Sequence, residues 1–87
     1  MEKRFAQIIY PNYNNQAVVP GNGTDFTVKE LQDIVGGSIE RIELPDNMAL
    51  VVNQDRVLQK LPYNEFASML FNFNLYGNVI LCYQDMI

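Results

Sequence analysis

Alternation between apolar and polar positions divides the chain into short segments that predict strands and helices. Residues 5–10 and 48–53 are rich in β-branched, aromatic or other apolar side chains, and turn-forming residues follow each segment, so both predict strands. Residues 38–44 alternate imperfectly but have the length and flanks of a strand. Residues 79–83 form a nearly continuous apolar run, which predicts a strand at the sheet centre or at a subunit contact.

Two short helices are predicted between these strands. Thr27 and Glu30 have the spacing of a capping box, and Gly36 or Gly37 can adopt the left-handed conformation that ends a helix. Asn64 is a plausible cap for a second helix. Helical spacing predicts that one apolar face of this second helix carries Phe66, Ala67, Met69, Leu70 and Phe73.

The predicted order of elements is β-α-β-β-(β)-α-β, with an optional short strand at residues 57–58. This order predicts one α+β domain over residues 1–87, in which two short helices pack on one face of a mostly antiparallel sheet. Residues 11–24 are dense in Pro, Asn and Gly and predict a long irregular loop, with a short strand at 17–19 as one option. A loop of that length is often functional, so we treat it as a candidate lid.

Composition narrows the class of protein. The 87 residues are 48% hydrophobic and 18% charged, which is typical of a globular domain. The net charge is -4 and the six basic residues are dispersed, so general nucleic-acid binding is not expected. No apolar segment approaches the length of a membrane span, and we expect a cytoplasmic protein. A domain this small buries limited surface, which favours a homo-oligomer.

The residue types exclude several kinds of catalytic site. The chain contains no histidine, which excludes Ser-His-Asp and Cys-His nucleophilic sites and most zinc sites. Glu40 and Glu43 flank Arg41 and could form an acid and base pair, but a solvated strand face explains them more simply. Cys82 has apolar neighbours that indicate a buried, inert thiol. We therefore expect no enzyme activity, catalytic residue, metal or cofactor.

Tyrosine, asparagine and isolated cations in the expected loops suggest a binding site. Aromatic faces stack on bases, amides read base edges and single cations meet phosphates, while Tyr and Asn also dominate adaptable protein-binding surfaces. The alternative is that these tyrosines fill the sheet face and the asparagines form turns. The candidate ligand-binding residues are Tyr13, Arg56, Lys60, Tyr63 and Asn64.

Three short motifs lie within residues 31–83: Val-Gly-Gly-Ser-Ile-Glu at 35–40, Leu-Pro-Tyr-Asn at 61–64 and Gly-Asn-Val-Ile-Leu at 77–81. In these motifs the chain resembles a family of small proteins from phages, plasmids and other mobile elements whose function is unassigned. This resemblance implies an accessory protein in the cytoplasm of a bacterial host. Sequestration of a small nucleotide-type immune signal is the first hypothesis, and inhibition of a host defence protein, of the anti-CRISPR or anti-restriction type, is the second.

Overall fold

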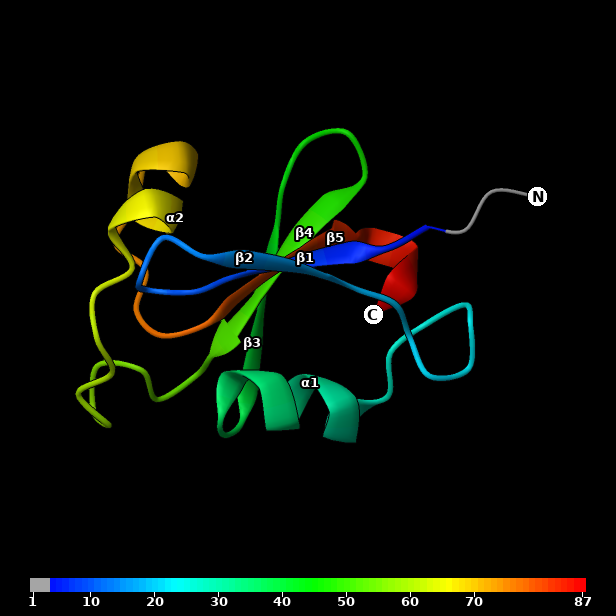
Figure 1. Ribbon diagram of the computed structural model, residues 1–87, viewed down its shortest axis with the longest axis horizontal. Helices are drawn as coiled ribbons and strands as arrows, with labels where there is room; N and C mark the ends of the chain where they lie inside the picture. The colour runs from blue at the N-terminus through cyan, green and yellow to red at the C-terminus, as the bar shows by residue number, and fades with distance from the viewer. Residues whose placement is uncertain (1–3) are drawn as a thin grey trace.

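A five-stranded antiparallel sheet and two helices form the protein in a computed structural model that describes residues 4–87 (Figure 1). Residues 1–3, which the predicted domain includes, lie outside the described residues. The strand order is β2-β1-β5-β4-β3, and each neighbouring pair is antiparallel. The predicted α+β class is therefore confirmed. The elements are β1 (Ala6–Ile9), β2 (Asn15–Val18), α1 (Val28–Val35), β3 (Ile39–Glu43), β4 (Met48–Asn53), α2 (Glu65–Phe71), β5 (Val79–Tyr83) and the 3₁₀ turn η1 (Gln84–Met86).

The helices cover opposite faces of the sheet, so the prediction that both lie on one face was wrong. Leu31 and Val35 of α1 pack with Val51 and Ile80, whereas Ala67 of α2 packs in a separate cluster. That second cluster contains Leu50, Val52 and Val79, the sequence neighbours of the first set. Because successive strand residues point to opposite faces, β4 and β5 need a cover on both sides. Figure 1 accordingly shows α1 below the sheet and α2 above it.

Both predicted helix starts are confirmed by their caps. The Thr27 hydroxyl accepts from the Glu30 amide at 3.1 Å, and the Glu30 carboxylate accepts from the Thr27 amide at 2.8 Å. Gly36 ends α1 in the left-handed conformation, with φ 82°. The Asn64 side chain accepts from the Ala67 amide at the start of α2. Each cap satisfies amides that the first helical turn leaves without partners.

The short extra strand lies before α1 and not after β4. Residues 11–24 were predicted to be irregular, with a short strand at 17–19 as one option. They contain β2, which overlaps that option, begins two residues earlier and pairs with β1 from Ala6↔Val18 to Ile9↔Asn15. The optional strand at 57–58 was wrong, because residues 54–60 form consecutive turns. The actual order is β-β-α-β-β-α-β. The chain between residues 10 and 14 is a tight hairpin connection, so residues 11–18 of the candidate lid belong to a β-hairpin and only residues 19–24 are irregular.

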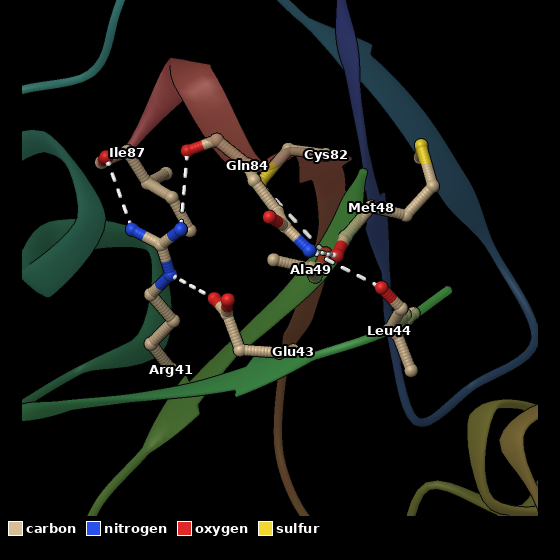
Figure 2. A network of polar contacts seen from close by, with 8 residues as sticks. All are labelled: Arg41, Glu43, Leu44, Met48, Ala49, Cys82, Gln84 and Ile87. Carbon is tan, nitrogen blue, oxygen red and sulfur yellow. Dashed lines mark hydrogen bonds and ion pairs between the residues drawn. The ribbon is translucent and has the colours of Figure 1, made fainter. Parts of the chain in front are cut away.

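A polar network connects residues 84–87 to the edge strand β3 and to the turn between β3 and β4 (Figure 2). Arg41 of β3 pairs with Glu43 at 2.6 Å and donates to the main-chain oxygens of Gln84 and Ile87. The Gln84 side chain donates to the main-chain oxygens of Leu44 and Met48 (at 2.9 Å for the latter). The suggested acid and base pair is thus divided between ion pairs, since Glu40 contacts Arg56 at 2.7 Å.

Candidate functional site

Exposed apolar and aromatic side chains gather around α2. We call this region the α2 surface and define it by Tyr13, Tyr63, Glu65, Met69, Leu70 and Phe73. Met69 is 71% exposed and Leu70 is 55% exposed, although Ala67, from the same predicted apolar face, is buried. A helix of seven residues makes two turns, and its bulky side chains point in more directions than the sheet can cover. Large apolar side chains exposed together mark interaction sites.

Two hollows flank α2. A cleft of about 500 Å³ lies on one side and is lined by Tyr63, Glu65, Ser68, Met69, Asn72, Phe73 and Asn74. A smaller groove of about 210 Å³ lies against the sheet and is lined by Gln7, Ile9, Asn15, Phe66, Leu70 and Leu81. The helix therefore stands as a ridge between an aromatic cleft and an apolar groove.

Tyr13 joins the β1–β2 hairpin to this surface. It adopts the left-handed conformation, with φ 72°, at the hairpin position that glycine usually occupies. Its hydroxyl donates to the Glu65 carboxylate, and this hydrogen bond is the main cause that raises the pKa of Tyr13. An uncommon backbone conformation thus holds an exposed aromatic ring at the start of α2, which is the kind of local strain found at functional positions.

Tyr63 is the second predicted site residue that reaches the α2 surface. Its ring packs edge-on against Tyr76, with centroids 5.5 Å apart, and it lines the aromatic cleft with Glu65. Tyr13 donates to the Glu65 carboxylate, and Glu65 lines the same cleft as Tyr63, so both tyrosines belong to this side of the α2 surface.

Asn64 was a candidate ligand-binding residue, but its side chain lies in the core. Its side chain is 0% exposed, and its amide group donates to the main-chain oxygens of Ile9 and Gly77, both at 2.9 Å. Ser68 also lines the cleft, but its hydroxyl is engaged with both the amide and the carbonyl of Leu75. Both polar side chains therefore hold the fold together.

The two predicted cations lie on another part of the chain. Arg56 pairs with Glu40 and lines a separate hollow with Val57 and Leu58. Lys60 is exposed at the end of the same turn segment, with φ 55°. The charged residue in the aromatic cleft is instead Glu65. Of the predicted set, Tyr63 lines the aromatic cleft and Tyr13 contacts its Glu65, whereas neither Arg56 nor Lys60 lines this cleft.

A further cleft of about 510 Å³ does combine a cation with an aromatic ring. Arg4 lies 5.0 Å above the Tyr83 ring and pairs with Asp85 at 2.9 Å. Asp46 and Asp85 both line this cleft, so its charge does not favour an anion. These residues were not predicted from the sequence, because they come from three separate segments that only the fold brings together.

The remaining chemistry is limited. Burial raises the pKa of the Cys82 thiol to about 11, so the thiol is protonated at neutral pH and weakly nucleophilic. Within residues 4–87, no three side chains of the His, Cys, Asp and Glu types lie close enough to hold a metal ion. Over the same residues, no helix has the length and apolar character to cross a membrane.

The fold and the α2 surface describe a small α+β domain with an exposed aromatic and methionine-containing face. The chain belongs to the family described as "Domain of unknown function (DUF3846)", which matches residues 9–86. This membership agrees with the resemblance to a family of unassigned function. No curated protein and no solved structure matches the chain.

Proposed function

We propose that this protein is a non-enzymatic binding protein and that it binds another protein through the α2 surface. The observation that carries the proposal is the exposure of Met69 and Leu70 on a ridge between two hollows. Methionine adapts to irregular partner surfaces, and exposed aromatic rings such as Tyr13 and Tyr63 supply contact area at low entropic cost. A groove beside a helical ridge suits a protein partner better than a compact small molecule.

Charge indicates the chemistry of the partner. The α2 surface carries the carboxylate of Glu65 and no Lys or Arg, and the chain has a net charge of -4. A partner with an apolar patch bordered by Lys or Arg would complement this surface, since complementary potentials favour association. The partner we propose is therefore a protein with a basic rim around an apolar patch.

A nucleotide-type ligand, our first hypothesis from the sequence, has less support from the geometry. Its phosphates would meet Glu65 in the aromatic cleft, while Arg56 lies in a different hollow and is already paired with Glu40. Arg4 is likewise paired with Asp85. The hypothesis of protein inhibition therefore becomes the leading one.

The resemblance to accessory proteins of mobile elements supports a host protein as this partner. Within that setting we propose a bacterial defence protein, bound in the host cytoplasm. This step rests on analogy of setting and not on site chemistry.

Site-specific photo-crosslinking in bacterial cells tests the proposal. A photoreactive amino acid replaces Met69 in one variant and Leu58 in the control, because Leu58 is 85% exposed but lies on the Arg56 turn. We expect one protein to crosslink from position 69 and not from position 58. The added change Tyr13→Gly, which suits the left-handed backbone, should reduce that crosslink.

Calorimetry with cyclic nucleotides and ADP-ribose derivatives is the competing arm of the test. Binding of one of these compounds, recovered intact after heat denaturation, would favour the sequestration hypothesis. Equal crosslinking from positions 69 and 58 would contradict a specific α2 surface.

A further inference from the structure

The two edges of the sheet differ in charge. The outer strand β3 has the sequence Ile-Glu-Arg-Ile-Glu, so three of its five residues are charged, whereas β2 is Asn-Gln-Ala-Val. Residues 5–24, which include β2 and the segments on both sides of it, contain no Asp, Glu, Lys or Arg. Charged side chains are a common protection of edge strands against pairing with other chains. The β3 edge has this protection and the β2 edge lacks it.

The register shows which main-chain groups of β2 face outward. The Tyr10 amide donates to the Asn14 oxygen at 2.9 Å, and the Tyr10 oxygen accepts from the Tyr13 amide at 3.2 Å, so both main-chain groups of Tyr10 point toward the β2 side. Main-chain groups of an antiparallel strand point to the same neighbour at every second residue, which places Gln16 and Val18 in bonds to β1. The amides and carbonyls of Asn15 and Ala17 therefore point away from β1. The same alternation gives Val19 an outward orientation, and the following Pro20 favours an extended backbone there.

We propose that β2 pairs antiparallel with β2 of a second copy of this chain, about a two-fold axis at Ala17. In this register Ala17 faces Ala17 of the second copy, and Asn15 faces Val19 in each direction. All three pairs consist of outward-facing residues, so each can exchange two hydrogen bonds. A register with the two-fold axis at Gln16 would place no extended residue of the second copy opposite Val19. That register would therefore form fewer hydrogen bonds between the copies. The sheets of the two copies become continuous.

Side chains at the seam favour a second copy as the occupant. Asn15 and Ala17 face the α2 side of the sheet, because they lie opposite Ile9 and Gln7, which line the groove beside α2. The exposed Val19 side chain of the second copy would lie opposite Asn15, at the rim of that apolar groove. Two chains with net charge -4 repel each other. Pairing through β2 keeps this repulsion low at the interface, because the segments that meet there carry no charge.

The pairing has a consequence for binding. A two-fold axis perpendicular to the sheet places both α2 surfaces on the same side of the assembly. The dimer would therefore present two identical protein-binding surfaces to one side. This arrangement suits a partner that is itself two-fold symmetric, since simultaneous binding at two sites raises avidity without new contacts.

Sedimentation across micromolar to millimolar concentration tests the pairing in the full chain. We expect the mass to rise from the 10.0 kDa of one chain to twice that value. Ala17→Lys and Ala17→Glu should each remain monomeric, because like charges would face each other at the axis. Their thermal unfolding should stay close to that of the unmodified protein at concentrations where it is a monomer, since the Ala17 side chain is exposed.

An equimolar mixture of the two variants provides the decisive arm. Opposite charges then meet at the axis, so we expect a dimer that contains one copy of each variant. Leu58→Lys, which adds the same charge away from β2, should dimerise like the unmodified protein. A monomer throughout the concentration series, a dimer of Ala17→Lys alone, or a mixture of folded variants that stays monomeric would each overturn the proposal.

Discussion

Replacing Asn64 by alanine should destabilise the fold more than the loss of an ordinary helix cap. The Asn64 side chain accepts from the Ala67 amide at 3.1 Å and donates to the oxygens of Ile9 and Gly77, both at 2.9 Å. It thereby connects the start of α2 to the end of β1 and to the turn before β5. These three contacts lie in a part of the core where the side chain is fully buried.

The expected magnitude follows from these contacts. Loss of the cap costs about 1 kcal/mol, and each buried carbonyl left without its donor costs about 1–3 kcal/mol. Allowing for partial relaxation of the structure around the alanine, we expect a loss of about 3 kcal/mol. Small domains have a free energy of unfolding of about 5–15 kcal/mol, so this single change should remove a large fraction of the stability.

Urea denaturation followed by circular dichroism measures the effect. Asn74→Ala is the matched control, because Asn74 is exposed, and it should change the free energy of unfolding by less than about 0.5 kcal/mol. Asn64→Asp keeps the acceptor for the cap and loses both donors, so it should be nearly as damaging as alanine. An Asn64→Ala protein within about 0.5 kcal/mol of the unmodified protein would refute this reasoning.

Three further changes test other parts of the fold. Thr27→Ala should cost about 0.5–2 kcal/mol and Thr27→Ser much less, since serine keeps the capping hydroxyl; equal midpoints in urea for both variants would argue against the cap. Gly77→Ala should cost at least about 1–2 kcal/mol, because Gly77 has φ 74° and an added Cβ would lie 2.7 Å from Leu61; an unchanged melting temperature would contradict this. The Cys82 thiol, with its pKa near 11, should react with a disulfide reagent at pH 8 only after unfolding, and rapid reaction of the native protein would show that it is accessible.

Much of the fold could be predicted because local signals are strong where one residue type has a defined task. Thr27, Gly36 and Asn64 were predicted at the helix ends where the structure places them. Residues 79–83 were predicted from their apolar run as a strand at the sheet centre or at a subunit contact, and β5 lies in the middle of the sheet. The same apolar run also indicated that both faces of the sheet are covered, because a strand that is apolar on both sides is buried on both sides.

Other features depend on tertiary context. β2 is an exposed edge strand of polar and small residues, so it lacks the apolar alternation that identifies a strand. Residues 57–58 are apolar but exposed in a turn. The α2 surface could not be predicted from spacing, because the pattern that placed Met69 and Leu70 on one apolar face does not show how much of that face the sheet covers.

Titration calorimetry with the protein crosslinked from position 69, once purified, tests the central claim most directly. We predict that Met69→Asp weakens binding at least about tenfold, or 1.4 kcal/mol, because it places a desolvated charge on the ridge of the α2 surface. Leu58→Asp, which adds the same charge elsewhere, should change the affinity less than about twofold. Equal affinities of the two variants would contradict the proposal that the α2 surface binds the partner.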